Sequence, residues 1–195
     1  MTIPSLLTQD MIDRYTAAGY WGSMTLADYL DYHAAYRPDS EAVIDPRQRV
    51  TFRQLKQATD RIALAMIEMG VRPEDRIGLQ TPNWVEYFYV RLACARIGAI
   101  PVPLIFSVRE HEIEYALKKS RAVGFFFCTD FHGFDYVEMV EGVRSRLPGV
   151  KHWVTMPARR ADNMACLQDM LDDPIETRFP PGHLLSFHPS ANDIQ

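Results

Sequence analysis

The stretch from residue 51 to residue 104 alternates two long helical patterns with short β-type runs, and this order limits the fold more than any other part of the chain. The first pattern recurs at steps of three and four, as one face of an α-helix does, through Leu55, Thr59, Ile62, Met66 and Met69. The second, 84–97, is apolar on most sides, which predicts a buried helix. Runs at 76–79 and 100–104 predict flanking strands. Strand–helix–strand units with helices of this length imply right-handed crossovers and a parallel sheet.

Helix starts are predicted by polar residues three apart, because each side chain can satisfy the other's backbone N–H. The sequence offers four such pairs: Thr25 with Asp28, Thr51 with Gln54, Asn83 with Glu86, and Ser107 with Glu110. Glycines at 70 and 98 predict the ends of the two central helices, since glycine accepts the left-handed conformation that closes a helix.

We therefore predict one α/β domain, with a mainly parallel sheet and helices on both faces. Residues 1–50 should form N-terminal helices and a hairpin, 51–156 the α/β core, and 157–195 an irregular C-terminal segment with a short helical turn near Leu167. The apolar run Phe125-Phe126-Phe127 favours a buried core strand over a ring-stacking surface, because the acidic chain lacks the cations that nucleic acid needs.

Composition excludes several classes of protein. The formal net charge of −4 provides no basic footprint for nucleic acid, and no run approaches the ~20 apolar residues of a membrane span. The first fifteen residues lack the basic and apolar regions of a secretory signal. Cys94, Cys128 and Cys166 are widely spaced, which favours buried free thiols in a cytoplasmic protein over zinc ligands or disulfides.

Three segments taken in order resemble the N-terminal part of the adenylate-forming superfamily, the AMP-dependent synthetases and ligases. They are Val50–Leu55 (VTFRQL), Arg76–Asn83 (RIGLQTPN) and Leu92–Leu104 (LACARIGAIPVPL). Within the superfamily, 14–21, 133–136 and 145–148 are most similar to aryl-acid AMP ligases of the 2,3-dihydroxybenzoate type and, more broadly, to acyl-CoA synthetases. The similarity runs from about Tyr15 to Leu171.

The resemblance implies the fold of the first subdomain of such enzymes. It also implies that the complete enzyme uses MgATP to convert an aryl or acyl carboxylic acid to acyl-AMP, which then passes to CoA or a carrier protein. The residues present do not identify which acid is activated or which acceptor takes the acyl group. The family's Ser/Thr/Gly-rich phosphate loop with its Lys, and its catalytic C-terminal Lys, have no counterpart here. We therefore expect an inactive fragment with no catalytic residue, no metal site and no bound cofactor of its own.

Arg109 is the one residue that we assign to ligand binding. It stands with Ser107 and His111 at a strand-to-helix junction, where a basic residue in a CoA ligase of this kind could face the CoA phosphates. The alternative is a capped helix with a solvated first turn. Asn83 occupies a similar junction, and a helix cap is its simpler interpretation.

Other polar residues favour structural interpretations. His132 and Asp135 flank Gly133 and have no nucleophile nearby in sequence, which favours a surface turn over acid–base catalysis. His183 and His188 lack metal-ligand spacing, and Arg159-Arg160 is typical of a solvated loop. No Gly-x-Ser-x-Gly surrounds Ser5, Ser107 or Ser145, so hydrolase chemistry has no support.

Two alternatives remain open on the residues alone. One is a free-standing, non-catalytic subdomain that acts as a structural or partner-binding module. The other is a flavodoxin-like binder of a small ligand. A piece of a larger enzyme should expose an apolar docking face, through which copies of the chain are expected to associate.

Overall fold

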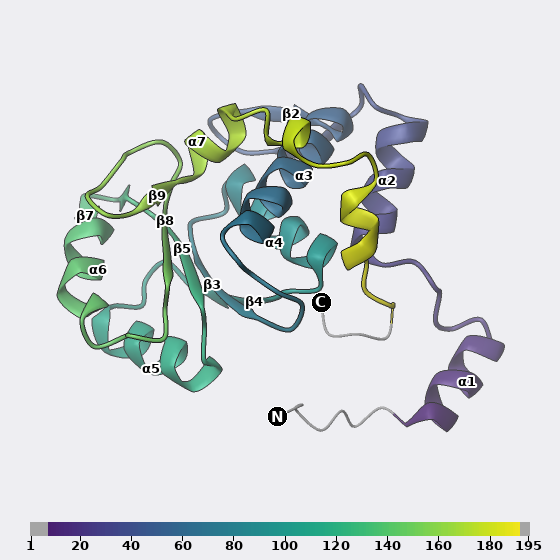
Figure 1. Ribbon diagram of the computed structural model, residues 1–195, viewed down its shortest axis with the longest axis horizontal. Helices are drawn as coiled ribbons and strands as arrows, with labels where there is room; N and C mark the ends of the chain where they lie inside the picture. Colours follow the sequence, from purple (N-terminus) through teal and green to yellow (C-terminus); the bar gives the residue numbers. More distant parts are fainter. Residues whose placement is uncertain (1–7, 192–195) are drawn as a thin grey trace.

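The computed structural model describes residues 8–191, and its centre is a five-stranded parallel sheet with helices on both faces (Figure 1). The strand order is β4-β3-β5-β8-β9. The strands are β3 (Arg76–Gln80), β4 (Ile100–Leu104), β5 (Gly124–Cys128), β8 (His152–Met156) and β9 (Ala165–Cys166). The predicted fold class is confirmed, although periodicity did not indicate the two-residue strand β9.

The two faces of the sheet are covered by different helices. On one face lie α2 (Leu26–Tyr36), α3 (Phe52–Glu68), α4 (Val85–Ile97) and α7 (Leu167–Asp172), and on the other α5 (Glu110–Ser120) and α6 (Tyr136–Arg144). Side chains of β5 alternate between the layers: Phe126 joins the core under α3 and α4, whereas Phe125 and Phe127 join the core under α5 and α6. All three rings are at most 1% exposed, as predicted for a core strand.

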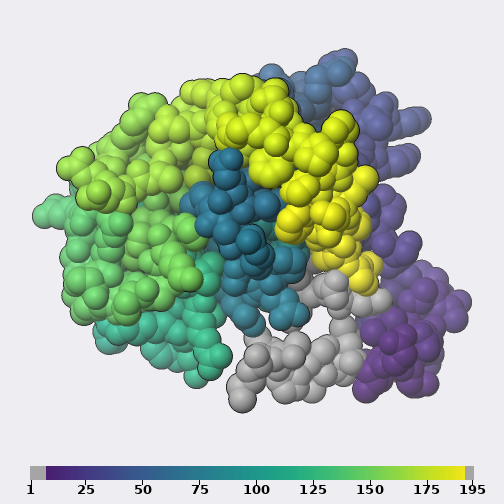
Figure 2. Space-filling model, viewed as in Figure 1, coloured from purple at the N-terminus to yellow at the C-terminus, as the bar shows by residue number. Residues whose placement is uncertain are grey.

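The smaller elements frame this sandwich. They are α1 (Gln9–Ala17), the hairpin of β1 (Glu41–Ile44) and β2 (Arg49–Thr51), the hairpin of β6 (Asp130–Phe131) and β7 (Phe134–Asp135), and the short helices η1 (Ile175–Arg178) and η2 (His183–Phe187). The C-terminal segment, yellow in Figure 2, packs against α3 and α4, where Ile175 is buried. Among residues 8–191, no helix is long and apolar enough to cross a bilayer.

Edge strand β4 carries Pro101 and Pro103, and the ladder shows which way they face. Ile100 donates its N–H to the carbonyl of Asp75, so residues 100, 102 and 104 bond towards β3. The two prolines therefore occupy the outward positions, where their missing N–H groups leave the free edge without donors. This edge resists pairing with a strand of another molecule.

Two of the four predicted capping pairs are confirmed. The backbone N–H of Thr25 donates to Asp28 at 2.7 Å, and that of Thr51 donates to Gln54 at 2.9 Å, each with the reciprocal bond. The other two are wrong. Helix α4 begins after Trp84 rather than Asn83, which is exposed. Helix α5 begins after Arg109, whose N–H donates to Glu112, and Ser107 lies outside it.

Asp45, in the turn of the first hairpin, supplies the cap that α4 lacks locally. Its Oδ2 accepts from the N–H of Val85 at 2.9 Å, and its Oδ1 accepts from the N–H groups of Arg47 at 2.7 Å and Gln48 at 2.8 Å. Burial alone would raise the pKa of Asp45, but these bonds and the Arg47 guanidinium outweigh burial and lower the pKa to about 2. The charged carboxylate therefore joins the hairpin to the central helix.

Replacing Asp45 with Asn should lower the free energy of unfolding at neutral pH by about 2 kcal/mol, because the interactions that hold the pKa of Asp45 at about 2 are lost with the charge. The folded pKa lies below the unfolded one, so this stabilisation is complete above about pH 4 and disappears as the pH falls towards about 2. Urea unfolding between pH 7 and pH 3 measures it.

The matched control is Asp39→Asn, because that carboxylate is 81% exposed and pairs with Arg53 on the surface. Its effect should stay below about 0.5 kcal/mol at every pH. An Asp45→Asn deficit that is equally large at pH 3 and pH 7 would contradict the role assigned to the charge.

Candidate functional site

The carboxyl ends of β3, β4 and β5 form the candidate site, because the chain leaves them towards opposite faces of the sheet. The connection after β3 leads to α4 on one face, whereas those after β4 and β5 lead to α5 and α6 on the other. In open parallel sheets such a reversal of direction leaves a crevice in which ligands bind.

Arg109 lies at this edge and is held in place by its own loop. Its Nη1 donates to the carbonyls of Phe106 at 2.9 Å and Val108 at 3.0 Å, and the guanidinium lies 3.9 Å above the centre of the Phe134 ring. Both hydrogen bonds from the guanidinium to the backbone leave from Nη1, and the Tyr136 side chain also interacts with the guanidinium. A cation held in this way can bind a phosphate or carboxylate.

Buried polar side chains support the same loop. Gln80 is 0% exposed, and its Nε2 donates to the carbonyls of Ile105 and Val108, each at 3.1 Å. The hydroxyl of Tyr136 donates to the carbonyl of Phe106 at 2.6 Å. Sequence reasoning missed both residues, because neither is near the loop in the chain.

Aromatic rings run along the edge beside Arg109. Phe131 contacts the rings of Trp84, Phe106 and His132, with centroids 5.8, 5.0 and 3.9 Å away. At the far end the Arg47 guanidinium lies 4.0 Å over the Trp84 ring. Because Asp45 and Glu86 both pair with Arg47, this second cation is neutralised, unlike Arg109.

The remaining predicted candidates are not brought together for catalysis. Asn83, Ser107 and His111 are exposed. His132 and Gly133 form the tight turn of the β6–β7 hairpin, with φ of 52° and 77°, the left-handed values that such turns require. Asp135 caps α6 by accepting from the N–H groups of Val137 and Glu138, and it pairs with Arg159 at 2.9 Å.

The other singled-out side chains have structural partners. Arg160 pairs with Asp169, His183 stacks on Phe179, and the Nε2 of His188 lies 3.2 Å from Asp28. The three cysteines, Cys94, Cys128 and Cys166, are free and buried, as predicted. Ser145 ends α6, and Ser5 lies outside the described residues.

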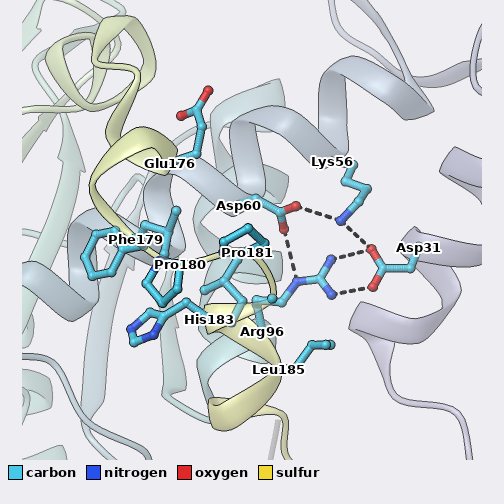
Figure 3. A pocket seen from close by; sticks show the side chains of 13 residues that line it. Asp31, Lys56, Asp60, Arg96, Glu176, Phe179, Pro180, Pro181, His183 and Leu185 are labelled. Carbon is cyan, nitrogen blue, oxygen red and sulfur yellow. Dashed lines mark hydrogen bonds and ion pairs between the residues drawn. The ribbon is translucent and has the colours of Figure 1, made fainter.

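A pocket of about 390 Å³ opens elsewhere, between α2, α3, α4 and the C-terminal segment (Figure 3). On one side Arg96 donates to both oxygens of Asp31 at 2.6 and 2.7 Å, and its Nε lies 3.1 Å from Asp60. Lys56 bridges the same two carboxylates at 2.7 and 2.6 Å. Burial would raise the pKa of Asp31, but Arg96 and Lys56 outweigh burial and lower the pKa to about 2.

This network serves structure better than ligand binding. Its two cations balance its two carboxylates, so it presents no net charge to a ligand. Arg96 also lies in the last turn of α4, beside the amino ends of the strands and away from the crevice. The network joins three helices, since Asp31 comes from α2 and Lys56 and Asp60 come from α3.

The described residues do not fit magnesium or a nucleotide triphosphate. None of their His, Cys, Asp and Glu side chains gather in threes as metal ligands. Gly-x-Gly and Gly-x-x-x-x-Gly-Lys are also missing from the sequence, so no glycine-rich loop can wrap phosphates. An anion contact at Arg109 is the chemistry that these residues do fit.

The expected apolar docking face stays a prediction. Tyr29, Tyr32 and Tyr36 on α2 are 50%, 52% and 77% exposed, and the last two stack with centroids 5.8 Å apart. These rings are an exposed aromatic surface of the kind that such a face needs.

The chain is similar to carboxylic-acid ligases. A family model described as AMP-binding enzyme matches residues 30–184. The medium-chain fatty-acid–CoA ligase of Escherichia coli is 36% identical over 72% of this chain and 25% of that protein. The 2,3-dihydroxybenzoate-AMP ligase of Bacillus subtilis is 30% identical over 86% of this chain and 31% of that protein.

Solved structures agree with these sequence matches. The apo structure of MbtA from Mycobacterium smegmatis superposes with a TM-score of 0.76 at 26% identity, over 86% of this chain and 31% of that one. An anthranilate CoA ligase in complex with anthranoyl-AMP, at 22% identity and a TM-score of 0.72, shares the fold over 80% of this chain and 29% of that one. The chain spans about a fifth to a third of the length of the curated relatives it matches.

Replacing Arg96 with Met should lower the free energy of unfolding by about 3 kcal/mol, because Arg96 is 3% exposed and its loss leaves Asp31 and Asp60 without their inner partner. Lys56→Met removes a cation that is 37% exposed from the same network and should cost less than about 1 kcal/mol. Urea unfolding of both variants measures the difference, and equal losses would show that burial does not set the strength of this network.

Proposed function

Because the chain belongs to the AMP-binding enzyme family, we propose that it is the N-terminal part of a ligase that activates a carboxylic acid with ATP. In the proposed reaction the acid and ATP give acyl-AMP and pyrophosphate, and a thiol then takes the acyl group and releases AMP. The observation that carries this proposal is the family match across residues 30–184, nearly all of the described core.

The proposal assigns this part a supporting role. Residues 8–191 provide no fit for magnesium or for phosphate wrapping, so adenylation would rely on residues outside them. The sheet and its helices would form one wall of the acid and nucleotide site. The names of the relatives include both fatty and aryl acids, so the substrate class proposed here is a small carboxylic acid.

For the second step we assign Arg109 to an anionic group of the thiol acceptor. Its guanidinium at the carboxyl edge is held by backbone carbonyls and a ring and makes no ion pair with a described residue, which supports a phosphate contact, as CoA or a phosphopantetheine arm would need. The three buried free thiols support a reducing compartment, so a cytoplasmic location is part of the proposal.

The alternative of a free-standing partner-binding module is less favoured. These relatives are acid–CoA and acid–AMP ligases, and the acids in their names are small carboxylic acids. Exposed tyrosines on α2 are compatible with either function, so they do not favour the module.

Exchange of labelled pyrophosphate into ATP tests the division of roles. The 195-residue chain alone should show none with any acid, whereas the protein encoded by the intact gene should show exchange that depends on one acid of a panel of aryl and fatty acids. Exchange by the chain alone would contradict the supporting role, and a lack of exchange by the intact gene product with every acid would contradict the ligase.

Arg109→Gln in the intact gene product should raise the KM for CoA by about 10-fold, since a charge-assisted hydrogen bond contributes about 1.5 kcal/mol or more, and should leave pyrophosphate exchange unchanged. Arg121→Gln is the control, because Arg121 is an exposed arginine at the opposite end of the same helix. Equal KM values for the two variants would remove Arg109 from the thiol site.

A further inference from the structure

We infer that Gln80 and Tyr136 are positioning residues, which fix the Arg109 guanidinium for the anionic group of the thiol acceptor; this inference rests on the proposed function. Neither residue need touch the ligand. They act through two backbone carbonyls, those of Phe106 and Val108, in the loop between β4 and α5, and Tyr136 also contacts the guanidinium directly.

Each of these carbonyls accepts two hydrogen bonds, one from Arg109 and one from Gln80 or Tyr136, which we call the two frame residues. The carbonyl of Phe106 accepts from the Tyr136 hydroxyl at 2.6 Å and from Arg109 Nη1 at 2.9 Å. The carbonyl of Val108 accepts from Gln80 Nε2 at 3.1 Å and from Arg109 Nη1 at 3.0 Å. The frame therefore orients the carbonyls, and the carbonyls orient the guanidinium.

The two frame residues are themselves immobilised. Gln80 is 0% exposed at the end of the central strand β3, and Tyr136 is 1% exposed in the first turn of α6. Burial raises the pKa of Tyr136, so its hydroxyl remains a donor at neutral pH. Because the two donors come from different elements, the loop is held from two sides.

A ring stack completes the arrangement. The guanidinium lies on Phe134, whose ring meets that of Tyr136 edge-on with centroids 4.9 Å apart. No ion pair among the described residues includes Arg109, so its charge is not neutralised by a carboxylate of the fold. A cation that is held at Nη1 and on one ring face, and that has no carboxylate partner, loses little entropy when it binds an anion.

Nitrogen-15 NMR of the Arg109 side chain tests the positioning without any ligand. Rotation of the guanidinium about its Nε–Cζ bond should speed up by about 3- to 10-fold in Tyr136→Phe and in Gln80→Met, because each removes the hydrogen bond that fixes one carbonyl. The matched control is Tyr89→Phe, which deletes the hydroxyl of a tyrosine that is 6% exposed and lies in α4. Unchanged rotation in both frame variants would overturn the inference, and having two variants covers the case in which one fails to fold.

Binding of CoA, used as the probe, tests the link to function in a double-mutant cycle. Tyr136→Phe should weaken CoA binding by about 3- to 10-fold in the wild-type background and have no effect in the Arg109→Gln background. A loss that persists without Arg109 would overturn the positioning role. Equal CoA binding by wild type and Arg109→Gln would instead remove Arg109 from the thiol site, and the rotation rates would still report on the positioning by Gln80 and Tyr136.

Discussion

Helix α4 carries a buried charge near each end. The ion pairs that neutralise these two charges fix the N-terminal third of the chain against the sheet layer. Glu86, in the first turn, is 4% exposed and pairs with Arg47 of the hairpin. Arg96, in the last turn, is 3% exposed and pairs with Asp31 and Asp60. Both signs suit the helix dipole, but neither charge tolerates burial without a partner. The hairpin and two helices are therefore fixed where the counter-charges are needed.

The sequence predicted the features that depend on neighbouring residues. The capping pairs at Thr25 and Thr51 are complete within four residues, and both appear in the structure as expected. The pairs at Asn83 and Ser107 have the same spacing but do not form. Asp45 caps α4 from forty positions away, and Glu112 accepts the hydrogen bond at the start of α5. Spacing cannot distinguish these cases, because a tertiary contact that reaches a helix start leaves no local pattern.

The same limit applies to the candidate site. Arg109 could be singled out because a cation at a strand-to-helix junction is a local feature of the sequence. Its orientation depends on Gln80 and Tyr136, which meet the loop only because β3 and α6 pack on either side of it. The strand over 76–79 was predicted from the sequence, but only the packed structure shows that Gln80 and Tyr136 converge on two carbonyls.

The proposed function accounts for which polar groups of this domain are paired and which are not. A fold that carries the reacting groups would need unpaired charge at its crevice. Here Arg47 is neutralised by two carboxylates, and Asp135 caps the start of α6. Arg109 differs, since the fold satisfies one nitrogen with backbone carbonyls and leaves the charge itself unpaired. A cation maintained in that state is of use to a ligand that brings its own negative charge, and a thiol acceptor that carries phosphate is such a ligand.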